Sequence, residues 1–262
     1  MTTIRGSRGD ATRTMELLWG LAPQPTRGPK QGLTLAAVVD AAVSLADAEG
    51  IDALSMRRVA ERLGVGAMSL YTYVPGKAEL VDLMLDRVYG EQRAGIATEG
   101  GWRARLESRA RADWALYERH PWVVRAAGPR PTLGPNESAV HEATLAAVDG
   151  VGLSGHEMVA VVTLVAGYVG GVAHGIVEAV AEGESHEDEE AWWRARSAVL
   201  ERAGAYTAER FPVSSRLGEE GVFDGSPDEP QYLAGEMRRA FEFGLERVLD
   251  GIAVLVDAHA AP

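Results

Sequence analysis

The chain has 262 residues, 46% of them hydrophobic, and it contains no cysteine. This length and apolar content suffice for one large domain or two ordinary ones, and the lack of thiols excludes disulfides, thiolate metal sites and cysteine nucleophiles. The formal net charge is −12, but residues 1–90 hold ten basic and ten acidic side chains, so the acidity belongs to residues 91–262. An acidic protein is a poor candidate for DNA binding as a whole, but a neutral front section is not excluded.

Residues 1–33 are predicted to form an N-terminal arm and linker. The short apolar stretch 15–21 is followed by the sequence APQPTRGPKQG, whose prolines and glycines resist regular packing. Arg27 and Lys30 in this arm are placed to enter a minor groove if the chain binds DNA.

Beyond the arm, the apolar residues recur at helical spacing, and no segment alternates with the period of a strand. We expect an all-α fold, with helices near 34–50, 55–63, 67–74, from 77 onward, 102–119, 121–127, 136–149, 155–181, 188–210 and 231–258. Thr34 and Ser55 are suited to cap the first two helices, and Gly50 is suited to end the first. Two acidic segments, 182–190 and 218–230, are expected to be solvated connections.

The segment 56–73, MRRVAERLGVGAMSLYTY, has the layout of a helix-turn-helix. Ala60 allows the two helices to approach closely, and Gly64 supplies the positive φ of the turn. Val65 and Leu70 fill the space between the helices. The same pattern occurs in helical hairpins that do not bind DNA, so the pattern alone leaves both interpretations open.

The run from Gly50 through SMRRVAERLGVGAMSLYTYVPGKAELVDLML closely resembles the TetR family of transcriptional regulators. In that family a segment of the form LYxHFxxKxxL joins the recognition helix to the next helix, and its places are occupied here by Leu70, Tyr71, Tyr73, Val74, Lys77 and Leu80. Tyr73 stands where His is usual. The resemblance is strong over residues 33–90. It implies a three-helix helix-turn-helix DNA-binding domain, residues 34–80, and a larger helical domain for ligand binding and dimerisation, residues 81–262.

The resemblance also implies that the start of the second helix and the whole third helix face double-stranded operator DNA. The DNA-contacting residues are then Ser55, Arg57, Ala67, Met68, Ser69, Tyr71, Thr72, Tyr73 and Lys77. Lys77, at the start of the fourth helix, is expected to meet a phosphate. The third helix carries no Arg, Asn or Gln, which read purine edges best, so Arg57 is the expected reader of guanine.

For the C-terminal helices, the resemblance implies a homodimer built on a four-helix bundle and a pocket for an unidentified small-molecule effector. An apolar stripe over 237–256 fits such a bundle, and the glycines at 167, 170, 171 and 175 permit close packing within one subunit or between two. The candidate ligand-binding residues are Trp114, Tyr117, Trp122, Tyr168, His174 and Glu178. Aromatic residues of this kind more often belong to an ordinary core.

The sequence shows no metal, cofactor or catalytic motif, and we expect a protein that is not an enzyme. His174 and Glu178 lie one helical turn apart, but two such groups make a weak metal site. The segment 241–256 resembles the last helix of the tetracycline repressor, which holds a metal-chelated drug with a His and a Glu. Val124 and Ile176 stand near those two places here, and neither side chain can bind a metal. The remaining alternative is a regulator or helical scaffold controlled by a protein partner.

The expected location is the cytoplasm. The first residues lack the apolar core of a secretory signal. The most apolar segment, residues 158–180, is interrupted by glycines, His174 and Glu178, so we expect no membrane span.

Overall fold

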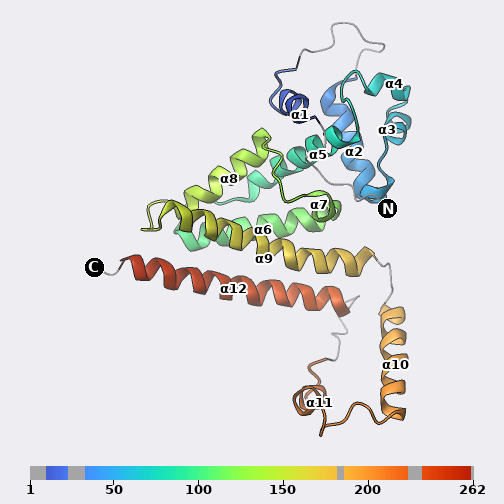
Figure 1. Cartoon of the computed structure of the whole chain (residues 1–262), viewed down its shortest axis with the longest axis vertical. Coiled ribbons are helices and arrows are strands. Elements are labelled where there is room, and N and C mark those ends of the chain that lie inside the picture. The colour runs from blue at the N-terminus through green and yellow to red at the C-terminus, as the bar shows by residue number, and fades with distance from the viewer. Residues whose placement is uncertain (1–9, 23–32, 182–185, 224–231, 261–262) are drawn as a thin grey trace. The chain divides into compact units, whose positions relative to one another are not determined.

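A computed structural model describes residues 10–22, 33–181, 186–223 and 232–260, without the side chains of residues 94, 178–181, 186–190 and 260. All regular elements in these ranges are helices, which confirms the all-α prediction (Figure 1). The chain divides into two compact units, residues Met1–His174 with Gly244–Pro262 and residues Gly175–Phe243, and each unit is described by itself.

The α-helices are α1 (Ala11–Leu18), α2 (Leu35–Glu49), α3 (Met56–Leu63), α4 (Ala67–Leu70), α5 (Lys77–Gln92), α6 (Trp102–Arg119), α7 (Trp122–Ala126), α8 (Pro135–Val148), α9 (Gly155–Ala181), α10 (His186–Arg202), α11 (Pro212–Glu219) and α12 (Tyr232–Ala260). Two short 3-10 helices, Ile51–Ala53 and Arg93–Gly95, follow α2 and α5. Helices α1 and α11 were not predicted. The start of α10 was expected to belong to a solvated acidic connection, which is wrong from His186 onward, because glutamate favours helices and their first turns.

The helix ends of the helix-turn-helix follow from local hydrogen bonds. Thr34 Oγ1 accepts a hydrogen bond from Ala37 N at 3.1 Å, and Ser55 Oγ accepts one from Arg58 N at 3.3 Å. Gly64 ends α3 in the left-handed conformation, with a φ of 66°. Both predicted N-caps and the predicted glycine turn are therefore confirmed.

The three helices share a core that continues into α5. Val38, Val59, Leu70, Val74 and Leu80 are fully buried in it. The short α4 ends at Leu70, but Val74 N donates to Leu70 O at 2.9 Å, so helical bonding continues for one more turn. Figure 1 shows α2, α3 and α4 gathered at one end of the first unit, with α5 leading from them toward α6 and α8.

Helix α5 is the central element of the first unit and packs on α1, α2, α6, α7 and α8. Every residue from Glu79 to Asp86 is buried. Asp86 Oδ1 accepts hydrogen bonds from the backbone N of Asn136 at 2.9 Å and of Glu137 at 3.0 Å, so it caps α8. A carboxylate there accepts hydrogen bonds from free N–H groups, and its negative charge interacts favourably with the positive end of the helix dipole. This cap fixes α8 on α5.

Part of the arm predicted over 1–33 is a packed helix, because its apolar stretch supplies one buried side. Leu17 of α1 is buried and joins the core of the helix-turn-helix. The segment 23–32, with Arg27 and Lys30, lies outside the described residues.

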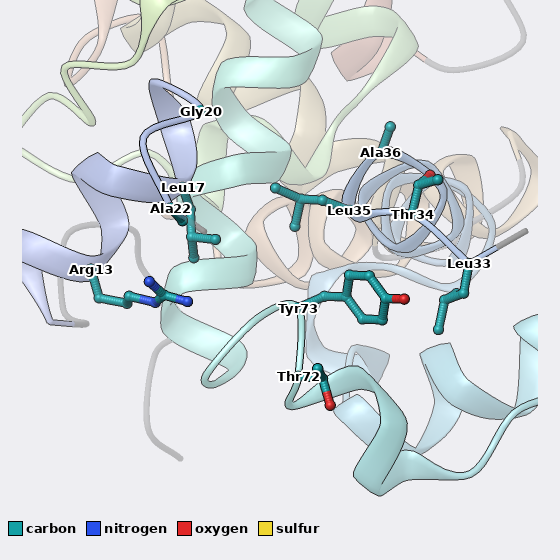
Figure 2. Close-up of a pocket in the computed structure, with 10 residues that line it drawn as sticks. All are labelled: Arg13, Leu17, Gly20, Ala22, Leu33, Thr34, Leu35, Ala36, Thr72 and Tyr73. Carbon is teal, nitrogen blue, oxygen red and sulfur yellow. The ribbon is translucent and has the colours of Figure 1, made fainter. Parts of the chain in front are cut away.

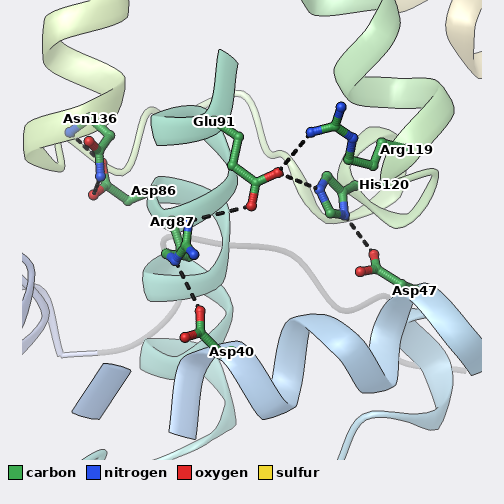
Figure 3. A network of polar contacts seen from close by, with 8 residues as sticks. All are labelled: Asp40, Asp47, Asp86, Arg87, Glu91, Arg119, His120 and Asn136. Atoms are coloured by element: carbon green, nitrogen blue, oxygen red, sulfur yellow. Dashed lines mark hydrogen bonds and ion pairs between the residues drawn. The ribbon is translucent and has the colours of Figure 1, made fainter. Parts of the chain in front are cut away.

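A polar network joins α2 to the ends of α5 and α6 (Figure 3). His120 is buried, with Nδ1 2.7 Å from Asp47 Oδ1 and Nε2 3.3 Å from Glu91 Oε2. Arg119 Nη1 lies 3.2 Å from the same Glu91 oxygen. Burial raises the pKa of Glu91, but the bonds from His120 and Arg119 outweigh it, and its pKa falls below the usual value. The network fastens the helix-turn-helix to the helices behind it.

Within the first unit, the start of α9 and the end of α12 run antiparallel. His259 Nε2 lies 3.3 Å from Glu157 Oε1, and the Tyr168 ring fills the space beside Gly244. The stretch Gly155–Val177 of α9 has a mean hydropathy of 1.8 and is long enough to cross a membrane. We expected no membrane span in this part of the chain, and by length and composition alone that expectation is wrong. A helix packed in a bundle has the same composition.

In the second unit, Gly175 of α9 lies against Met237 of α12. No residue of α11 is buried, and many large apolar side chains of this unit are exposed. They include Trp192, Trp193, Tyr206, Phe211, Val213 and Phe223.

Candidate functional site

The side chains predicted to touch DNA lie at the start of α3, on α4 and the turn that follows it, and at the start of α5. We call residues 67–73 the reading segment. The exposed members of the predicted set are Arg57, Met68, Tyr71 and Thr72, and the half-buried ones are Ser55, Ala67, Ser69, Tyr73 and Lys77. Met68 is 78% exposed, so this large apolar side chain adds nothing to the core and is free to contact a partner.

Arg57, the predicted base reader, is exposed on α3. Its side chain is 83% exposed, and its Nε lies 2.7 Å from Glu61 Oε1 on the next turn of α3. The hydrogen bond and negative charge of Glu61 raise the pKa of the guanidinium. An exposed pair of this kind contributes little stability, so the guanidinium can leave Glu61 for a base at little cost.

Lys77 has a partner inside the protein. Its ammonium donates a hydrogen bond to the carbonyl of Leu54, the residue before the α3 cap Ser55. Burial lowers the pKa of the ammonium, and the carboxylate of Asp52 opposes that effect. Lys77 therefore ties the start of α5 to the start of α3, the two helix ends that were expected to face DNA.

A buried polar cluster lies between α5, α6 and α8, and we define it as Gln92, Arg109, Asp113 and Thr144. Arg109 Nη2 lies 2.8 Å from Asp113 Oδ1, and Arg109 Nη1 donates to Thr144 Oγ1 at 2.7 Å. Gln92 Nε2 donates to Asp113, but the buried Gln92 Oε1 accepts no hydrogen bond from any residue that the structure describes. Burial raises the pKa of Asp113, and Arg109 opposes the rise. The cluster thus holds one unused acceptor inside the protein.

The predicted site residues did not include this cluster, although the sequence carries a signal for it. On α6, Arg109 and Asp113 fall on the same helical face as Leu106 and Ala110, which are fully buried. Charged residues inside an apolar stripe are costly unless they are paired, so they mark a buried polar site.

Three of the predicted ligand-binding aromatics lie near this cluster or near α9. Trp114 is buried on α6, and Tyr117 is half-buried one turn further on. Burial and the carboxylate of Asp113 raise the pKa of the Tyr117 phenol, and a methyl group at Gly170 of α9 would touch its hydroxyl. Tyr168 is half-buried between α9 and α12, where it leaves no room for a side chain at Gly244.

The other three predicted ligand residues lie in different surroundings or outside the described side chains. Trp122 is buried in the core of the helix-turn-helix, and its Nε1 donates to Asp47 Oδ1 at 2.7 Å. His174 is exposed on α9, and the side chain of Glu178 lies outside the described residues. Within the described residues, no three His, Asp or Glu side chains gather in a group that could hold a metal ion.

The glycines of α9 divide between two roles. Gly170 and Gly175 face Tyr117 and Met237 of the same chain, whereas Gly167 and Gly171 face open space. The open side continues through exposed apolar residues of both helices, and we define this outer face as Val159, Ala160, Leu164, Gly167, Gly171, Gly251 and Val254. Part of it is a groove of about 390 Å³ between α9 and α12.

Comparison with known families decides what this arrangement belongs to. Residues 38–84 match the family model described as bacterial regulatory proteins, tetR family. Residues 95–256 match the model described as tetracyclin repressor-like, C-terminal domain. The chain belongs to the TetR family. As a member it is a DNA-binding transcriptional regulator, and the resemblance found in the sequence is confirmed.

Individual TetR-family proteins are similar along most of this chain. The HTH-type transcriptional repressor DrrR1 of Streptomyces coeruleorubidus is 45% identical over 97% of this chain and 90% of its own length. The class A tetracycline repressor protein from transposon 1721 of Escherichia coli is 28% identical over 82% of this chain and 88% of its own length. Apo ActR of Streptomyces coelicolor is similar in structure, with a TM-score of 0.66, 26% identity and coverage of 89% and 100%. ActR in complex with actinorhodin has a TM-score of 0.64 and 27% identity, and the match covers 86% of this chain and 97% of ActR.

Proposed function

We propose that this TetR-family protein is a homodimeric repressor that binds operator DNA through α3 and the reading segment. A small molecule bound beside the polar cluster releases it from the operator. The protein acts by binding and not by catalysis, in the bacterial cytoplasm where its DNA target lies. The repressor name of DrrR1 and the actinorhodin complex of ActR support the two halves of this proposal.

One observation carries the proposal, namely what lies at the two ends of α5. This helix of 16 residues begins at Lys77, in the predicted DNA surface, and ends at Gln92, in the polar cluster. At 1.5 Å per residue it spans about 24 Å. A ligand that donates a hydrogen bond to Gln92 Oε1 would therefore act on the same rigid element that positions Lys77.

The aromatic neighbours suggest what else the ligand contacts. Tyr117 and Trp114 on α6 offer apolar rings beside the cluster, and Tyr168 offers another on α9. A pocket with apolar walls and a few hydrogen-bonding groups is typical of small-molecule sites. The proposed pocket leaves out Trp122, which is buried in a different core, and His174, which is exposed.

Release from the operator requires that the ligand prefer one conformation of the dimer. We propose that α5 is displaced in the preferred conformation. The distance between the two reading segments then no longer matches the spacing of successive major grooves, about 34–36 Å for half-sites one turn apart. The ligand then stabilises the protein and weakens operator binding in the same concentration range.

The DNA half of the proposal is tested by selecting bound sequences from a pool of random duplexes with the purified protein. We expect enrichment of a site with two half-sites related by two-fold symmetry, and a footprint that covers both. Recovery of unenriched sequences would contradict the proposal.

The effector half is tested on the selected operator, with actinorhodin as the first probe and a panel of small aromatic compounds after it. A true effector raises the unfolding temperature and lowers operator affinity together. The variant Gln92→Leu keeps operator affinity but loses most of the release, because the acceptor Oε1 is gone. Equal release from the wild type and the variant would remove Gln92 from the site.

A further inference from the structure

Helix α1 is fastened to the rest of the first unit at both ends. The backbone N–H of Asp10 donates to Glu79 Oε1 at 2.9 Å, at the start of α5. At the other end, Trp19 Nε1 donates to the carbonyl of Leu133 at 3.0 Å, in the loop before α8. Leu17 is buried between these anchors. The side chains on the outer side of α1 therefore have fixed places beside the helix-turn-helix.

A cleft of about 440 Å³ lies between α1 and the helix-turn-helix (Figure 2). Arg13 reaches into it from α1, and Thr34 lines it at the start of α2. Thr72 and Tyr73 line its other side, at the end of the reading segment. A duplex that contacts Thr72 and Tyr73 would pass over this cleft, which brings its backbone within reach of Arg13.

The charge of Arg13 is suited to a phosphate. Its Nη1 lies 2.9 Å from Glu16 Oε2, and its side chain is 34% exposed. A guanidinium has five N–H donors in a planar fork, so one bond to Glu16 leaves donors for a phosphate. Three basic side chains of the proposed DNA surface are already engaged. Arg57 pairs with Glu61, Arg58 pairs with Glu49, and Lys77 bonds to a backbone carbonyl. An additional cation therefore matters in a chain of net charge −12.

We propose that Arg13 binds a backbone phosphate beside the nucleotides contacted by Thr72 and Tyr73, so that α1 is part of the DNA-binding surface. This inference rests on the proposed function, because it presupposes that duplex DNA lies against α3 and the reading segment. A phosphate contact adds affinity without sequence preference, so its loss is measurable on any duplex.

The test measures the affinity of the full-length protein for a random-sequence duplex at several salt concentrations. The variants are Arg13→Gln, Arg13→Lys and the matched control Arg216→Gln. Arg216 forms a comparable exposed pair with Glu220 at 2.7 Å, on α11 of the second unit. We expect Arg13→Gln to bind severalfold more weakly and to reduce the salt slope by about 0.9 per subunit, or about 2 per dimer. The Arg13→Lys variant should keep most of the slope.

A further variant, Glu16→Gln, should bind DNA more tightly, because it removes a negative charge and frees the guanidinium. Thermal unfolding of each variant checks that α1 remains folded. The inference is overturned if Arg13→Gln keeps the wild-type slope or changes it no more than Arg216→Gln does. A loss confined to A·T-rich duplexes would also overturn it, because that pattern marks an arginine in the minor groove. If the wild type itself bound duplexes without salt dependence, the proposed function would fail first.

Discussion

At the residue scale, the cations of the proposed DNA surface have partners in the free protein. Arg57 pairs with Glu61, Arg58 pairs with Glu49, and Lys77 bonds to the Leu54 carbonyl. Phosphates and base edges compete for the same N–H groups, so DNA binding must exchange or share these bonds. In the free protein, two carboxylates and one backbone carbonyl hold these cations in place.

Arg57→Ala tests the proposed base reader. We expect it to lower operator affinity by about 1–3 kcal/mol, with the loss concentrated at one base pair, because a bidentate contact to guanine is lost. The measurement is a titration against a set of operators in which each base pair is changed in turn. An equal loss for every sequence would move Arg57 from the bases to the backbone.

Lys77→Met tests the proposed phosphate contact. Affinity should fall by about the same factor for every sequence in the operator set, because a phosphate contact carries no sequence information. Stability should also fall, by roughly 1 kcal/mol in urea unfolding, because the Leu54 carbonyl loses its donor. A loss that varied from one sequence to another would refute the phosphate assignment.

Arg109→Met tests the buried polar cluster. The variant leaves Asp113 buried without its cation, and we expect a loss of about 3–5 kcal/mol in the free energy of unfolding near neutral pH. A carboxyl whose pKa is raised by folding costs stability above that pKa, and the cost disappears as the pH falls.

The deficit of Arg109→Met should therefore shrink as the pH is lowered from neutrality toward the ordinary pKa of a carboxyl group, as measured by urea titrations. The double variant Arg109→Met/Asp113→Leu is the control, and it should recover most of the lost stability. A deficit that did not change with pH would show that packing, and not charge, explains the loss.

At the element scale, α5 holds the first unit together because every residue from Glu79 to Asp86 is buried. Its buried stretch contacts helices before and after it in the sequence, and it carries Asp86 to the N-terminus of α8. The loop before α8 also accepts the bond from Trp19, so α1, α5 and α8 form one connected group. A displacement of α5 would therefore also displace α1 and α8.

Asp86→Ala tests the cap that joins α5 to α8. The variant loses the two backbone hydrogen bonds and a third one, which Asn136 Nδ2 donates to Asp86 Oδ2 at 3.0 Å. We expect a destabilisation of roughly 2 kcal/mol in urea unfolding. Asp40→Ala is the matched control, because Asp40 forms an exposed pair with Arg87 at 3.0 Å, and it should cost less than about 1 kcal/mol. Similar losses in the two variants would show that Asp86 does not act as a cap.

At the scale of the whole molecule, the outer face of α9 and α12 is an apolar surface that one subunit leaves uncovered in its first unit. Gly167 and Gly171 on α9 have open space where a side chain would stand, and Val254 on α12 is 72% exposed. Small and apolar residues at helical spacing allow two such helix pairs to pack closely. The proposed homodimer would bury this face in a four-helix bundle.

Leu164→Glu tests this dimer face. Leu164 is exposed on α9 and lines the groove, so a carboxylate there should prevent association. We expect sedimentation to show monomers at concentrations where the wild type is dimeric, with a large loss of affinity for a two-half-site operator. Val213→Glu, at another exposed apolar site on α11, is the control and should leave both the dimer and the operator affinity unchanged. A dimeric Leu164→Glu variant would place the interface elsewhere.

Much of the fold was predictable because it depends on neighbours in the sequence. The caps Thr34 and Ser55, the glycine turn at Gly64 and the apolar stripes each act over a few residues, so their pattern specified the helices. The TetR resemblance of residues 33–90 has the same origin, since the helix-turn-helix is built from one continuous segment. The exposed residues of the reading segment are those that do not belong to the apolar stripes.

Other features depend on contacts between distant segments, which spacing along the chain does not reveal. Trp122 was expected in a ligand pocket, but it bonds to Asp47, 75 residues away. Gln92 meets Asp113 only because α5 and α6 pack together, and α1 became a helix of the fold through Glu79 and Leu133. Local spacing thus determined the helices and the family. The tertiary packing alone decided which polar groups became buried, which were paired and which surfaces stayed open, because these depend on residues brought together only by folding.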